Sequence, residues 1–242
     1  MSPRVNHSSF PESRWQLTKS RSKTVKYLSR YNIMKILNPG ITEYIEGILP
    51  ARRSPFDRME AYAKENSFPI IGPLVGTMLQ QYVLTTGAKQ IFELGSGYGY
   101  SALWMAEVLP PDGRIYLTDR KQENKQMADE FFVEAGQADK MEFHVGDALE
   151  IFDKFDGPFD IVLNDIDKQG YLDSIEPVKK RLKKGGLFIT DNILWSGRIL
   201  DSERDQTTEA IMEFTRKLYA DKDFLTSIAP VRDGITVAVK LN

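Results

Sequence analysis

Short apolar segments alternate with longer amphipathic segments through the middle of this chain. Five short segments have the length and the branched or aromatic content of buried strands: QIFEL (90–94), RIYLT (114–118), MEFHV (141–145), FDIVL (159–163) and GLFIT (186–190). The segments between them predict helices that begin at Ser101, span Lys121–Ala135, follow Asp147 and span Tyr171–Leu182. Because each crossover then carries a helix, the alternation predicts a parallel sheet with helices on both faces.

The flanking parts of the chain complete this α/β pattern. Two final apolar segments, FLTSIAPV and ITVAVKL, flank the turn residues Arg232-Asp233-Gly234 and predict an antiparallel pair that closes the sheet. We therefore expect one domain over residues 34–242, with an N-terminal helical cap (34–86) and a mostly parallel sheet that ends in a C-terminal antiparallel strand. Three further helices are predicted before the first strand and one after the fifth: Ile41–Leu49, Pro55–Lys64, Gly72–Thr85 and Thr208–Tyr219.

The first 33 residues differ from the rest in composition. They hold seven Lys or Arg residues, seven serines and one acidic residue. We expect residues 1–33 to form a basic, disordered tail, and the alternatives are a transit peptide or an arm that binds nucleic acid.

The composition of the whole chain excludes several classes of protein. The 242 residues carry a net charge of −2, which disfavours nucleic acid and anionic membranes as partners. Cysteine is absent, which removes disulfides, thiolate nucleophiles and Cys-ligated metals and fits a reducing compartment. No apolar run approaches the roughly 18 residues of a membrane span. We expect a cytoplasmic protein without membrane contact.

A glycine-rich segment follows the first predicted strand directly. Its glycines recur at every second position, so it differs from the GxGxxG spacing of dinucleotide folds. A GxGxG segment preceded by an acid suits a ligand whose amino-acid end carries an ammonium and a carboxylate, and Glu93 is placed to hold the cationic part. The alternative is a turn that binds nothing. The residues expected to contact this ligand are Glu93, Gly95, Ser96, Gly97, Tyr98 and Gly99.

Acidic residues end the next two predicted strands. Asp119 lies where an acid accepts hydrogen bonds from ribose hydroxyls in nucleoside-binding sheets. Asp147, between Gly146 and Ala148, occupies the corresponding position for an adenine ring. Each Asp has a structural alternative as a helix N-cap. Three neighbouring strand ends of this kind together favour a nucleoside pocket.

A second polar group follows the fourth and fifth predicted strands. Asp165, Asp191 and Asn192 converge if these two strands are neighbours, and two carboxylates at close range need a cation or a proton between them. Oxygen ligands favour Mg²⁺, with Ca²⁺ or Mn²⁺ as alternatives. Lys168 is a candidate general base on a substrate hydroxyl, although a solvated lysine is its ordinary role. His144, within a strand, is expected to be a packed residue and not a ligand.

Three longer strings carry a resemblance to a known family. FELGSGYGYSALWMA (92–106), NDIDKxxY (164–171) and TDNxLWSG (190–197) resemble the cation-dependent, S-adenosylmethionine-dependent O-methyltransferases, which include the caffeoyl-CoA and catechol O-methyltransferases. The resemblance implies a Rossmann-like class I methyltransferase fold and Lys168 as the base. It implies Asp165, Asp191 and Asn192 as metal ligands, with Asp165 also near the cofactor. The cofactor contacts that it implies are Glu93, Gly95, Ser101, Asp119, Asp147 and Ala148.

The motifs and the resemblance together predict methyl transfer from S-adenosylmethionine to a hydroxyl. The expected acceptor is a small, catechol-like molecule with vicinal oxygens that a divalent cation activates. Trp195 is expected to stack on a flat acceptor, and Tyr171 to line its pocket, although each can equally serve packing. By analogy the enzyme is expected to be a homodimer. The alternatives are methylation of a hydroxylated tRNA nucleoside, a nicotinamide-dependent oxidoreductase and a non-catalytic binding module.

Overall fold

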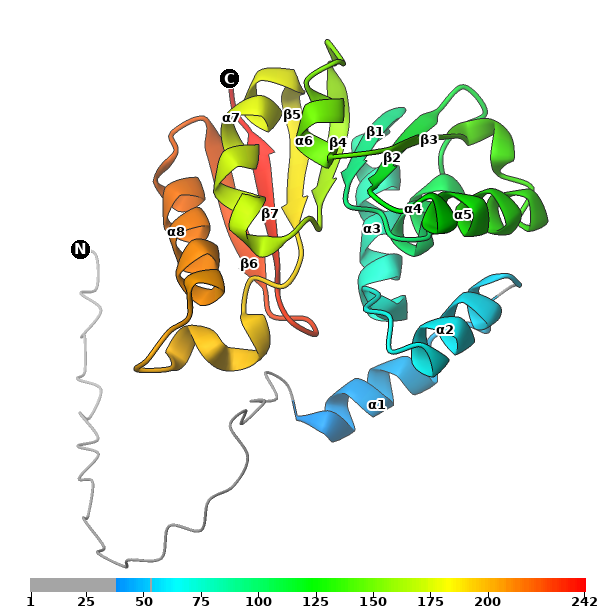
Figure 1. Cartoon of the computed structure of the whole chain (residues 1–242), viewed down its shortest axis with the longest axis horizontal. Coiled ribbons are helices and arrows are strands. Elements are labelled where there is room, and N and C mark those ends of the chain that lie inside the picture. The colour runs from blue at the N-terminus through cyan, green and yellow to red at the C-terminus, as the bar shows by residue number, and fades with distance from the viewer. Residues whose placement is uncertain (1–37, 53) are drawn as a thin grey trace, which may run out of the picture. The chain divides into compact units, whose positions relative to one another are not determined.

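The computed structural model describes residues 38–52 and 54–242 (Figure 1). The expected basic tail, 1–33, lies outside the described residues. The described chain contains a seven-stranded sheet with the order β3-β2-β1-β4-β5-β7-β6. The strands are β1 (Gln90–Leu94), β2 (Arg114–Asp119), β3 (Met141–Val145), β4 (Phe159–Asn164), β5 (Leu182–Thr190), β6 (Phe224–Ala229) and β7 (Ile235–Lys240).

The strand directions confirm the predicted sheet. Strands β1 to β5 pair in parallel, whereas β7 pairs antiparallel with both β5 and β6. Only β7 therefore opposes the other strands. β5 begins at Leu182, four residues before the predicted start at Gly186. The prediction missed these residues because the polar Lys183 and Lys184 break the apolar pattern. The strand extends over them because a register shift against β4 lets Leu182 pair with Phe159.

Eight α-helices are described, and all of them fall within predicted helical segments or extend them by a few residues. α8 begins two residues earlier than predicted because Asp205 caps it, its carboxylate accepting the Thr208 backbone N–H at 2.7 Å. The helices are α1 (Pro39–Ile48), α2 (Phe56–Glu65), α3 (Gly72–Thr86), α4 (Tyr100–Ala106), α5 (Gln122–Glu134), α6 (Ala148–Phe152), α7 (Tyr171–Arg181) and α8 (Gln206–Ala220).

Alternate residues of the strands form two separate cores, one on each face of the sheet. Ile91 and Ile161 pack with residues of α2 to α5, whereas their neighbours Phe92 and Val162 pack with α6 to α8. This two-sided burial explains why the strands read as near-continuous apolar runs. Among the described residues, no helix is both long and apolar enough to cross a bilayer.

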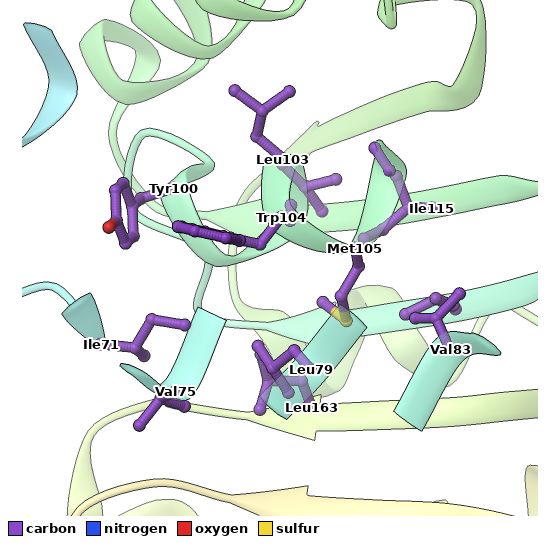
Figure 2. Packing of buried hydrophobic residues seen from close by; sticks show 14 of the residues in the cluster. Ile71, Val75, Leu79, Val83, Tyr100, Leu103, Trp104, Met105, Ile115 and Leu163 are labelled. Atoms are coloured by element: carbon purple, nitrogen blue, oxygen red, sulfur yellow. The ribbon is translucent and has the colours of Figure 1, made fainter. Parts of the chain in front are cut away.

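Helices α3 and α4 pack closely in the first core. Figure 2 shows Val75 and Leu79 of α3 near Trp104 and Met105 of α4. The approach requires a glycine, since a Cβ at Gly76 would lie only 2.5 Å from the Trp104 ring. This contact fixes α4, and with it the glycine-rich loop from which α4 begins.

The order of the strands determines where a ligand can bind. The chain runs outward from β1 through β2 to β3 and then returns to β4 on the other side of β1. Such a reversal leaves a crevice at the carboxyl ends of the central strands, where open α/β sheets bind ligands. The polar strand ends singled out in the sequence all lie at this edge.

Candidate active site

A cavity of about 970 Å³ opens at the carboxyl edge of the sheet. The loops after β1 to β5 line it together with the segment between α2 and α3. Three of the expected site residues, Glu93, Gly99 and Tyr171, are not among its lining residues. Fourteen others line it: Gly95, Ser96, Gly97, Tyr98, Ser101, Asp119, Gly146, Asp147, Ala148, Asp165, Lys168, Asp191, Asn192 and Trp195.

The glycine-rich loop lies directly against the end of β4. Gly95 has a φ of +81°, and a Cβ there would lie 2.7 Å from the Asp165 carbonyl oxygen. No other residue type fits this approach. Gly99 serves packing instead, because a Cβ would meet Leu117 and Phe132 at 3.2 Å beneath the loop.

Thr118 holds the glycine-rich loop against β2. Its backbone carbonyl accepts the Ser96 N–H at 2.7 Å, and its hydroxyl accepts the Gly95 N–H at 3.1 Å while donating to the Glu93 carbonyl at 2.9 Å. Thr118 was not predicted as a site residue. The available signal was a buried hydroxyl within an otherwise apolar strand.

Glu93 lies fully buried below the loop. The Ser101 hydroxyl donates to its Oε1, whereas Oε2 has no hydrogen-bond partner among the described residues. Burial raises the pKa of Glu93 to about 7, against the lowering effect of Ser101 and Ser96. Glu93 is therefore a buried acceptor behind the cavity wall, and its Oε2 has no partner among the described residues.

The acids after β2 and β3 already have structural partners. Asp119 accepts the Lys121 N–H at 2.8 Å and the Asn124 amide at 2.9 Å. Asp147 caps α6 by accepting the Leu149 N–H at 3.0 Å, so the structural alternative for this residue is realised. Both side chains also line the cavity, which leaves the nucleoside role open to them.

Arg120 joins three of the loops at this end of the cavity. Its guanidinium lies 2.8 Å from the Asp147 carboxylate and 3.2 Å from that of Asp167. The ion pair with Arg120 lowers the pKa of Asp147. Sequence reasoning missed Arg120, because its partners lie 27 and 47 residues away.

The expected metal ligands come together at the ends of β4 and β5. Asn164 pairs with Thr190 across these strands, so Asp165 and Asp191 follow at the same level. Asp191 is 7% exposed, and burial together with the charge of Asp165 raises its pKa to about 7. Lys168 Nζ lies 2.8 Å from Asp165 Oδ1. Among the described residues no three His, Cys, Asp or Glu side chains form a metal cluster, so this set is two carboxylates and an amide.

Tyr171 does not line the pocket, contrary to the expectation. It is fully buried, and its hydroxyl donates to the Asp191 backbone carbonyl at 3.0 Å. Lys168 Nζ lies over its ring, 5.2 Å from the centroid. Tyr171 therefore supports Asp191 and Lys168 from behind.

Trp195 lines the cavity, with the Arg198 guanidinium 5.2 Å from its ring centroid. The cap supplies further wall residues that sequence reasoning missed: Phe68, Pro69, Ile70 and Ile71. Phe68 sits on the glycine-rich loop, where a Cβ at Gly97 would approach its ring to 2.9 Å. These residues have no polar signature, so only the fold places them here.

Comparison with known proteins agrees with this geometry. A family model described as O-methyltransferase matches residues 58–241. Caffeoyl-CoA O-methyltransferase 1 from Eucalyptus globulus is 32% identical over 179 residues, which cover 69% of this chain and 73% of the plant protein. Its counterpart from Zea mays is 34% identical over 175 residues, covering 67% and 68%.

Solved structures show the same fold. The O-methyltransferase TomG from Streptomyces achromogenes, involved in tomaymycin synthesis and solved with S-adenosylmethionine, is 25% identical with a TM-score of 0.75, covering 84% of this chain and 96% of its own. The motifs, the crevice and these relatives exclude the nicotinamide-dependent and non-catalytic alternatives. The chain belongs to the cation-dependent, S-adenosylmethionine-dependent O-methyltransferase family and is an enzyme that uses this methyl donor.

Proposed function

We propose that this enzyme methylates a hydroxyl of a small molecule with two vicinal oxygens, and that a divalent cation, with Mg²⁺ first among the candidates, activates that hydroxyl. One observation carries the proposal: Asp165, which lines the cavity with Asp191 and Asn192, touches the glycine-rich loop through its own backbone at Gly95. The proposed donor and acceptor sites therefore lie side by side in space, where these two stretches of main chain touch.

The residues present fit a hard divalent cation. Two carboxylates and an amide offer only oxygen ligands, which Mg²⁺, Mn²⁺ and Ca²⁺ prefer. The raised pKa of Asp191, about 7, shows that burial beside Asp165 penalises its charged form, and a bound cation removes that penalty. When bound by these residues, such a cation would supply Lewis-acid activation of an acceptor hydroxyl whose pKa is otherwise near 10.

The donor half fits S-adenosylmethionine. The loop from Gly95 to Tyr98 lets the backbone approach the amino-acid end of the donor, and the unpartnered Oε2 of Glu93 lies below it as an acceptor reached directly or through water. Asp119 is proposed to accept hydrogen bonds from the ribose hydroxyls of the donor. Asp147 and Ala148 are proposed to border the adenine.

Lys168 and Trp195 are proposed to act on the acceptor. Lys168 Nζ lies 2.8 Å from Asp165 Oδ1, so in its neutral amine form it can take the proton of an acceptor hydroxyl held beside Asp165. Trp195 offers a flat face to an aromatic acceptor. A homodimer remains our expectation from the resemblance, and sedimentation equilibrium measures it.

A methyl-transfer assay tests the proposal. The panel holds catechols, hydroxycinnamoyl thioesters, flavonoids and hydroxylated RNA, each with chelator and with Mg²⁺ restored. We expect transfer to a small vicinal diol that chelator abolishes and Mg²⁺ restores. Transfer that is insensitive to chelator, or confined to RNA, contradicts it.

A further inference from the structure

The turn between β6 and β7 contacts the loop that follows β5. Gly234 and Asp233 accept the backbone N–H groups of Ile193 and Leu194 through their carbonyls, each at 2.9 Å. The Asp233 carboxylate in addition accepts the Ser196 N–H. Three successive anchors therefore fix the loop that begins with Asn192.

This loop needs external anchors because its backbone is strained. Asn192, Trp195 and Ser196 have φ values of +57°, +46° and +52°. Left-handed conformations are unfavourable for a non-glycine residue and persist only where neighbouring structure imposes them. The hydrogen bonds to Asp233 and Gly234 impose them here.

Asn192 opens this loop directly before the Ile193 N–H that the Gly234 carbonyl accepts. The anchors on the turn therefore help to set where the proposed metal ligand Asn192 lies.

The neighbouring Arg232 ties the same turn to the cap. Its guanidinium donates to the Ile70 carbonyl at 2.7 Å and lies against Gly72. Ile70 and Trp195 both line the cavity. One turn therefore contacts two segments that line it, the loop over 192–196 and the cap at Ile70.

We propose that Asp233 is a positioning residue, which holds the backbone of the loop over 192–196 and thereby places Asn192 for the cation and the Trp195 ring for the acceptor. The inference rests on the proposed function. It adds a residue outside the three oxygen ligands whose loss weakens metal and acceptor binding while it spares the methyl donor.

Two variants test the proposal, Asp233→Ala and Asp233→Asn. The control variant is Asp223→Asn. Asp223 lies at the far end of the same hairpin. Mg²⁺ binding to the protein saturated with S-adenosylhomocysteine is measured by calorimetry, alongside hydrogen exchange over 192–200 and both KM values. For Asp233→Ala we expect Mg²⁺ affinity and acceptor KM to worsen about tenfold, with faster exchange and the donor KM unchanged. Asp233→Asn keeps an accepting oxygen and recovers most of each loss.

The outcomes separate the inference from the function on which it rests. If the wild-type enzyme binds no divalent cation and ignores chelator, the proposed function fails. If the wild type is metal-dependent and Asp233→Ala binds Mg²⁺ and acceptor normally, or Asp233→Asn is as impaired as Asp233→Ala, the inference fails. Should Asp233→Ala not fold, Asp233→Glu replaces it, because it moves the carboxylate by one methylene. Normal Mg²⁺ affinity in that variant overturns the inference.

Discussion

Glu93 shows how a single buried group links the cofactor site to stability. Its folded-state pKa of about 7 lies above its ordinary value of 4.5, because burial penalises the charge. The folded protein therefore binds the Glu93 proton more tightly than the unfolded chain does. Stability from this group is fully present below about pH 4.5 and is lost as pH rises through 7.

Glu93→Gln should flatten this dependence. Between pH 5 and 8 we expect the ligand-free wild type to lose roughly 2–3 kcal/mol of unfolding free energy that the Glu93→Gln variant does not lose. Urea unfolding across this range measures the difference. Glu130→Gln on the exposed face of α5 serves as the control. Equal slopes for wild type and Glu93→Gln would mean that the carboxylate is not desolvated.

Lys168 permits a second prediction at the same scale. Lys168→Ala should lower the transfer rate about a hundredfold at pH 7, the usual contribution of a general base. The deficit should shrink as pH rises, because the acceptor hydroxyl then ionises without help. The exposed Lys222→Ala is the control. A pH–rate profile parallel to that of the wild type would remove Lys168 as the base.

At the scale of elements, the site depends on how α3 packs against α4. The glycine-rich loop leads into α4, and α4 is held by the contact between Gly76 and Trp104. Packing there leaves no room for a methyl group. We therefore expect a substitution in α3 to displace α4, and with it the glycine-rich loop.

Gly76→Ala should destabilise the protein by about 1–3 kcal/mol, since overpacking forces the Trp104 ring or the helix to move. Gly47→Ala is the matched control, because a Cβ there meets nothing within 4 Å. Thermal unfolding of both variants measures the effect. Equal melting temperatures would show that the contact between α3 and α4 adapts freely.

At the scale of the whole molecule, the two halves of the cavity come from different parts of the sheet. The ends of β1 to β3 supply the proposed donor half, and the ends of β4 and β5 supply the proposed metal half. Loss of a ligand in one half should leave binding in the other intact.

Asp165→Ala tests this separation. We expect it to abolish metal-dependent transfer while S-adenosylmethionine still stabilises the fold, by about 2.7 kcal/mol at a concentration of 100 Kd. Thermal shift with the donor and calorimetry with Mg²⁺ measure the two halves. Equal loss of both would contradict the division.

The sequence predicted what depends on local pattern. Strand ends fall at one edge of a parallel sheet, so Asp119, Asp165 and Asp191 were placed correctly by periodicity alone. The contribution of Phe68 and Arg120 was missed because it arises from contacts between distant segments. Tyr171 was misplaced since its hydroxyl partner is a backbone carbonyl 20 residues away, which no side-chain pattern reveals.

The contact between Gly95 and the Asp165 carbonyl has one further consequence. The main chain of the proposed donor loop and that of the proposed metal ligand Asp165 meet there with no room for a Cβ. We therefore expect substitutions in the cap or at Trp195 to change which acceptor enters and to leave the spacing between these two stretches of main chain unchanged.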